Sequence, residues 1–132
     1  MLTAKTRFET PDCTLEIGRV RRGRLLIVLS GKDLGELGSA PFERLEAELM
    51  RSPSLELFID LQAASGATLE VSGSWAVWLR KHQARLNKVT MLTGSPFIHM
   101  SAKAVKRFSQ LGERARLYSD PLQFATELAA AS

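Results

Sequence analysis

The sequence predicts an α/β fold in which helices pack on a mostly parallel central sheet. One observation is a continuous aliphatic run at residues 25–29 (LLIVL), which suits a strand covered on both faces. A second is that short apolar runs alternate with longer segments in which apolar residues recur at helical spacing. The predicted order of elements is β-β-α-β-α-β-α-β-α, and strands that alternate with helices form parallel sheets.

Length and composition predict one domain. A chain of 132 residues with 45% hydrophobic and 24% charged residues can bury a core of its own. We expect residues 1–11 to form a polar leader and residues 12–132 to form the domain. The net charge of +4 falls short of the dense basic patch of a nucleic-acid binder, so we do not expect nucleic acid as a partner.

The cysteine content and the hydropathy pattern predict a cytoplasmic location. The single cysteine, Cys13, excludes an internal disulfide framework and suits a reducing compartment. The first residues have no apolar core of signal-peptide length, and no segment approaches the length of a membrane span.

The first two strands are predicted to form a hairpin. Residues 13–20 alternate imperfectly between apolar and polar side chains, and a tight polar turn separates them from the aliphatic run at residues 25–29. The turn and its flanks carry an arginine cluster made up of Arg19, Arg21, Arg22 and Arg24. A solvated charged turn is the simplest interpretation, and docking to an acidic protein is the main alternative.

A helix and a third strand follow the hairpin. Residues 30–39 form a glycine-punctuated loop, and Ser39 is a good N-cap for a helix with Pro41 in its first turn. The turn at residues 51–54 ends this helix before a strand at residues 55–61.

The second half of the chain continues the alternation. Residues 73–87 predict a helix because Trp75, Trp78, Leu79 and His82 fall on one apolar stripe. Later elements are a strand at residues 89–93, a helix from Pro96 to about Leu111, a strand at residues 115–118 and a last helix from residue 121 to about residue 130.

Residues 57–79 are the most informative stretch for function. An apolar strand ends in Asp60, a loop of small residues follows, and Ser72-Gly73 is predicted to begin the helix, with Ser72 as its N-cap. Parallel strands present their C-terminal loops at one edge of a sheet. We therefore expect Asp33, Asp60, Glu70 and Ser72 to form an acidic rim there, with Asp60 capping its own loop.

This stretch, together with the order of elements, resembles the STAS family, the domain of bacterial anti-sigma factor antagonists. The resemblance covers about residues 13–130 and rests on Gly31, on Ser39-Ala40-Pro41-Phe42, on residues 57–61 and on Ser72-Gly73. In regulated members, a partner kinase phosphorylates the serine or threonine before that glycine, and the phosphate releases the anti-sigma partner. The resemblance therefore implies Ser72 as a phosphorylation candidate.

The sequence departs from the family pattern just before Ser72. Glu70-Val71 stand where the family has Asp-Ser, and the interval from Asp60 to Ser72 is longer than usual. An alignment without gaps places Glu70 on the phosphoacceptor position instead.

The function that these observations predict is a non-catalytic protein-interaction module in bacterial signalling. The resemblance implies an anti-sigma factor or a kinase-like regulator as partner, and a homodimer is left open. The predicted partner-binding edge consists of Asp33, Asp60, Glu70, Ser72 and Gly73. No phosphate-binding loop, dinucleotide fingerprint or nucleophile elbow is present, so we expect no enzyme and no cofactor.

The alternative is a protein of the STAS/Sec14-like group that binds a small molecule or a lipid. Its pocket would be lined by Trp75, Trp78 and Phe97, although tryptophans on an apolar stripe are more often core residues. Two isolated histidines and one cysteine give no metal-ligand spacing, so no metal is expected.

Overall fold

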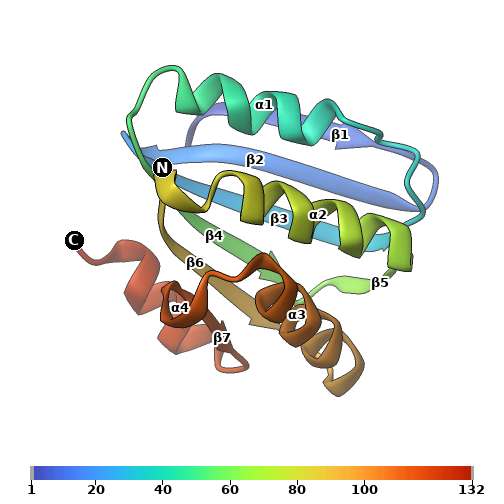
Figure 1. Ribbon diagram of the computed structural model, residues 1–132. Helices are drawn as coiled ribbons and strands as arrows, with labels where there is room; N and C mark the ends of the chain where they lie inside the picture. Colours follow the sequence, from blue (N-terminus) through green and yellow to red (C-terminus); the bar gives the residue numbers. More distant parts are fainter. Residues whose placement is uncertain (1, 132) are drawn as a thin grey trace.

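A seven-stranded sheet organises residues 2–131, the part of the chain that the computed structural model describes (Figure 1). The strands lie in the order β1-β2-β3-β4-β6-β7, and β5 pairs with β3 beside this path. The strands are β1 (Thr3–Glu9), β2 (Cys13–Arg21), β3 (Arg24–Asp33), β4 (Leu55–Leu61), β5 (Ala64–Ala67), β6 (Leu86–Thr93) and β7 (Ala115–Tyr118). The helices are α1 (Ala40–Leu49), α2 (Leu69–Lys81), α3 (Pro96–Ser109) and α4 (Pro121–Ala129).

The predicted α/β fold with a mostly parallel sheet is confirmed. β2 and β3 form the predicted antiparallel hairpin, and β3, β4, β6 and β7 are parallel neighbours. Among residues 2–131, no helix is long and apolar enough to cross a membrane.

Residues 3–9, expected to belong to a polar leader, instead form β1, which pairs antiparallel with β2. An edge strand needs burial on one face only, and charged side chains along it discourage further pairing. Phe8 packs against the core while Lys5 and Arg7 stay exposed. The polar residues that suggested a leader are therefore the exposed side chains of an edge strand. Met1 and Ser132, the ends of the predicted leader and domain, lie outside the described residues.

Helix α2 begins earlier than predicted. It starts at Leu69 rather than at residue 73, because Thr68 is the N-cap and its side chain accepts a hydrogen bond of 3.1 Å from the backbone N–H of Val71. The loop before it contains the unpredicted strand β5, which pairs in parallel with the end of β3. The helix ends at Lys81, and a short 3-10 turn at Gln83–Arg85 leads into β6.

The two faces of the sheet are covered differently. Helices α1, α2 and α3 lie side by side over one face, where Leu57, Ile59 and Met91 belong to the main core (Figure 1). On the other face, Phe124 of α4 packs with Phe58 and Leu92. Successive side chains of a strand point to opposite faces, so neighbouring residues of β4 serve different cores.

Part of the arginine-rich hairpin is internal rather than solvated. Arg24 is only 2% exposed, donates a hydrogen bond of 2.8 Å to Glu56 and one of 2.9 Å to the carbonyl of Leu128, and lies 5.2 Å from the ring centre of Phe58. Arg19 pairs with the buried Glu48 of α1. These two arginines join α4 and α1 to the sheet, so the interpretation of the whole cluster as a solvated turn is wrong for them.

Gly31 has a structural reason to be glycine. Its φ of +82° lies in the left-handed region, and a Cβ at this position would collide with the backbone of Asp12. Only glycine adopts such a conformation without strain. The glycine after the second predicted strand therefore allows the close approach of β3 to the loop that precedes β2.

Candidate functional site

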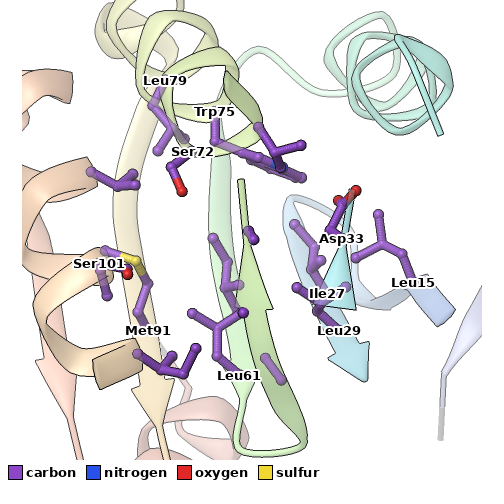
Figure 2. A pocket seen from close by; sticks show the side chains of 18 residues that line it. Leu15, Ile27, Leu29, Asp33, Leu61, Ser72, Trp75, Leu79, Met91 and Ser101 are labelled. Carbon is purple, nitrogen blue, oxygen red and sulfur yellow. The ribbon is translucent and has the colours of Figure 1, made fainter. Parts of the chain in front are cut away.

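An apolar cavity lies between the sheet and helices α2 and α3 (Figure 2). Its volume is about 90 Å³. The sheet contributes aliphatic side chains such as Leu29 and Ile59, and Met91 adds a thioether. Helix α2 contributes Trp75 and Leu79. The cavity is thus built by elements that are far apart in the sequence.

Polar side chains enter this apolar lining at three positions, namely Asp33, Ser72 and Ser101. Asp33 ends β3 and is 5% exposed. Its Oδ1 accepts a hydrogen bond of 2.9 Å from the N–H of Gly35, and its carbonyl accepts one of 3.1 Å from the N–H of Thr68. Asp33 therefore holds the β3–α1 loop and the start of α2 together at the edge of the cavity.

Ser72 is not the N-cap of α2, contrary to prediction. It is the fourth residue of the helix, and its N–H donates a hydrogen bond of 3.0 Å to the carbonyl of Thr68. The side chain is half-buried, and Figure 2 shows its hydroxyl directed toward the sheet. Gly73, expected to begin the helix, is an exposed residue within it.

A second hollow opens beside the cavity, between the β3–α1 loop and the first turns of α2. We call it the cleft; its volume is about 200 Å³, and Leu34, Phe42 and Glu70 are among its lining residues. Asp33, Val71 and Trp75 line both the cleft and the cavity. These shared residues form the wall between the two hollows.

Two leucines lie exposed at this end of the molecule. Leu34 in the β3–α1 loop is 44% exposed, and Leu69, the first residue of α2, is 93% exposed. Two acidic residues close to them in the sequence, Glu36 and Glu70, are also exposed. We call Leu34, Glu36, Leu69 and Glu70 the docking edge. Sequence reasoning missed the leucines because an apolar residue next to a predicted strand or helix is normally assigned to the core.

Asp60 does not join the other predicted edge residues. Its Oδ1 accepts a hydrogen bond of 2.9 Å from the N–H of Gln62, as expected for an aspartate that caps its own loop. Successive side chains of β4 point to opposite faces of the sheet. Leu61 packs against the main core, whereas Asp60 points to the same face as Phe58, which is covered by α4. The structure therefore brings together Asp33, Glu70 and Ser72 but places Asp60 on the opposite face.

Of the predicted pocket residues, only Trp75 lines the cavity. Trp78 is 5% exposed, donates its indole N–H to Glu46 over 3.0 Å and stacks on Phe42, so it is a core residue between α1 and α2. Phe97 is 63% exposed on α3. The aliphatic strand residues that form most of the cavity carried no signal of a pocket in the sequence.

The histidines occupy structural positions. His82 packs on Trp78 with ring centres 4.4 Å apart, and burial lowers its pKa while Glu46 opposes that shift. His99 shares a hydrogen bond of 2.9 Å with Thr93. Neither histidine lines the cavity or the cleft. Within residues 2–131, no group of three or more histidine, cysteine or acidic residues could hold a metal ion.

Comparison with solved structures identifies the fold. A protein of the DUF3478 family with a SpoIIAA-like fold from Shewanella loihica superposes with a TM-score of 0.64 at 16% identity, covering 93% of this chain and 98% of that one. An anti-sigma factor antagonist from Mycobacterium paratuberculosis gives a TM-score of 0.58 at 17% identity, covering 93% of this chain and 100% of its own. SpoIIAA, an anti-sigma factor antagonist, in its unphosphorylated form gives 0.54 at 16% identity, with coverage of 89% and 99%.

No family model and no curated protein sequence matches the chain. At identities of 16–17%, what the chain shares with these structures is the fold. The chain is an α/β domain with the SpoIIAA-like fold, which is the fold that the resemblance to the STAS family implied.

Proposed function

We propose that this chain is a non-catalytic binding domain that docks a protein partner at the docking edge. The observation that carries the proposal is the pair of exposed leucines, Leu34 and Leu69, beside a cleft at one end of the sheet. Large apolar side chains exposed next to a hollow and surrounded by polar residues are typical of interaction sites.

The negative charge of the docking edge predicts a positively charged surface on the partner. Glu36 and Glu70 are exposed there, and Asp33 lies just beneath. A partner with a basic rim around an apolar pocket would complement it. Two of the similar structures are anti-sigma factor antagonists by name, which supports an anti-sigma factor or a kinase-like regulator in bacterial signalling as the partner. A cytoplasmic location suits such a role.

Regulation by phosphorylation at Ser72 is a separate question from docking itself. Its hydroxyl is half-buried over an apolar cavity, so a kinase would reach it only if the first turns of α2 opened. Glu70, which an ungapped alignment places on the phosphoacceptor position, is exposed and has a carboxyl group where a phosphoacceptor has a hydroxyl. We therefore propose docking that does not depend on a phosphate at Ser72.

The absence of catalysis is proposed on chemical grounds. Ser72 and Ser101 bring hydroxyl groups to the cavity, and neither histidine nor lysine is among the residues that line it. Within residues 2–131, the carboxylate of Asp33 is hydrogen-bonded to the N–H of Gly35 and to neither serine. A serine nucleophile needs an adjacent base within hydrogen-bond distance. The cavity wall therefore offers a hydroxyl without the group that would activate it.

Site-specific photocrosslinking tests the docking edge. A photoreactive amino acid replaces Leu69 in one variant and Leu122 in a control, since Leu122 is also a leucine in the first turn of a helix and is 73% exposed. We expect a protein crosslink in cells from position 69 and none from position 122. Equal crosslinking from both positions, or none from position 69, would contradict the proposal.

A second candidate function, binding of a small apolar ligand, is favoured by the cavity. Cavities lined by aliphatic side chains stay dry and accept apolar molecules. Native mass spectrometry of the protein purified under mild conditions checks whether a ligand accompanies it, and a spectrum of the bare chain alone would count against this function.

A further inference from the structure

We propose that the cavity binds a small amphiphile with a short apolar tail and a positively charged amine, and that Asp33 pairs with the amine. This inference rests on the second candidate function and adds the chemical class of the ligand. It begins from a buried carboxylate, that of Asp33, which forms no ion pair with any residue in the described range 2–131.

Asp33 is 95% buried, since its exposed fraction is 5%. From the residues that the structure describes, its side chain accepts one hydrogen bond, donated by the N–H of Gly35. The ion pairs among residues 2–131 engage other acids, namely Glu9, Glu16, Glu46, Glu48, Glu56 and Glu127, and none includes Asp33. Burying a carboxylate is costly unless a cation or several hydrogen bonds compensate for it. A ligand ammonium group would supply the missing partner.

The position of Asp33 fits a ligand with two different ends. Asp33 lies in the wall shared by the cavity and the cleft, and Trp75 belongs to the same wall. Figure 2 shows both side chains on the α2 side of the cavity, above the aliphatic strands. An ammonium group in this wall can contact the carboxylate and the indole face together, because aromatic rings attract cations. The tail then extends over Leu29 and Ile59.

The size of the cavity limits the tail. At about 90 Å³ it is smaller than an engineered apolar cavity of about 150 Å³ that binds benzene. We therefore expect a tail of about four carbons to fit without rearrangement of α2 or α3. The hydroxyls of Ser72 and Ser101 leave room for a modestly polar substituent on that tail.

The test compares three molecules that share a butyl chain and differ in charge: n-butylammonium, n-butanol and butanoate. Each is titrated into the uniformly ¹⁵N-labelled protein, and amide shifts are followed at Gly66, Ala67 and Ala102, which line the cavity. We expect n-butylammonium to bind at least tenfold more tightly than n-butanol, and butanoate to produce no shifts at these amides.

Two matched variants locate the charge preference. Asp33→Asn keeps an oxygen for the N–H of Gly35, and Asp60→Asn is its control because Asp60 also accepts one backbone N–H at 2.9 Å but lies on the other face of the sheet. The preference for n-butylammonium over n-butanol should disappear in Asp33→Asn and persist in Asp60→Asn.

The outcomes separate the two propositions. Equal binding of n-butylammonium and n-butanol by the natural protein would overturn the role of Asp33 while leaving the apolar ligand site in place. No shift with any of the three would overturn both. If Asp33→Asn fails to fold, the comparison of the three molecules on the natural protein still decides whether the cavity prefers a positively charged ligand.

Discussion

At the scale of single residues, a buried ion cluster joins α1 to the sheet. Glu48 of α1 is 1% exposed and accepts hydrogen bonds of 2.7 and 3.1 Å from Arg19 and one of 2.9 Å from Arg44. Arg44 also donates to the carbonyl of Ala4 and the hydroxyl of Thr6 in β1. The hydrogen bonds from Arg19, aided by Arg44, hold the pKa of Glu48 below its usual range against the opposing effect of burial.

The lowered pKa of Glu48 predicts a pH-dependent contribution to stability. A carboxyl group whose pKa is lower in the folded state stabilises the protein above its unfolded pKa of about 4.5 and loses that effect as the pH falls through the folded pKa. Glu48→Gln should therefore cost about 3 kcal/mol at pH 7 and flatten the stability curve below pH 5. Urea unfolding across pH 3 to 7 measures this.

The exposed Glu113 supplies the control for Glu48. Glu113→Gln should change the free energy of unfolding by less than about 0.5 kcal/mol and preserve the acid dependence of the natural protein. The same acid dependence in Glu48→Gln as in Glu113→Gln would show that the cluster does not hold α1.

At the scale of elements, the start of α2 determines what Ser72 can do. With Thr68 as the N-cap, Ser72 sits one turn into the helix and lines the cavity. A negative charge there would face the apolar side chains of the cavity wall. The free amide donors at the start of α2, which can hold a phosphate at a helix N-terminus, belong to residues closer to Thr68.

This geometry predicts that Ser72→Asp acts on stability. We expect it to lower the free energy of unfolding by about 2 kcal/mol or more, because it buries an unpaired charge. Ser74→Asp is the control, since Ser74 is exposed on the same helix, and it should cost less than about 0.5 kcal/mol. Urea denaturation of both variants provides the comparison. A Ser72→Asp protein as stable as the control would mean that the position tolerates a phosphate.

The predictability of the elements follows their local signals. The aliphatic run of β3 and the starts of α1 and α3, with Pro41 and Pro96 in their first turns, were recognisable without tertiary information. The predicted cap Ser39 makes no side-chain capping hydrogen bond, and its hydroxyl donates to Glu43 instead. β5 was not, because its small residues (ASGA) gain strand structure only from pairing with β3. The start of α2 was misplaced since Ser72-Gly73 has the composition of a helix start, while Thr68 provides the cap.

At the scale of the whole molecule, the alternation of side chains across the sheet decides which residues can act together. The sequence predicted an acidic rim, and of its members Asp33 and Ser72 line the cavity while Glu70 lines the adjoining cleft. It could not exclude Asp60, whose side depends on the register of β4 against its neighbours. The cavity was likewise hidden, since its lining extends from Leu15 to Val105 and exists only after α2 and α3 pack on the sheet.

The same topology gives the molecule one end suited to binding. The docking edge and the cleft lie at the end of the sheet where β3 leads into the β3–α1 loop and where α2 begins. The opposite end is fastened by Arg24, which joins the sheet to the last turn of α4 and to the residues that follow it. Binding at this end of the molecule therefore requires that a protein partner contact Glu70, Leu34 and Leu69.

The most direct test is the affinity of the partner that crosslinks to position 69, measured by isothermal titration calorimetry. Glu70→Lys reverses a charge in the docking edge, and Glu113→Lys reverses an exposed charge outside it. The predicted result is at least tenfold weaker binding, or about 1.4 kcal/mol, for Glu70→Lys and unchanged binding for Glu113→Lys. Equal affinities for the natural protein and both variants would contradict the proposal that this edge docks the partner.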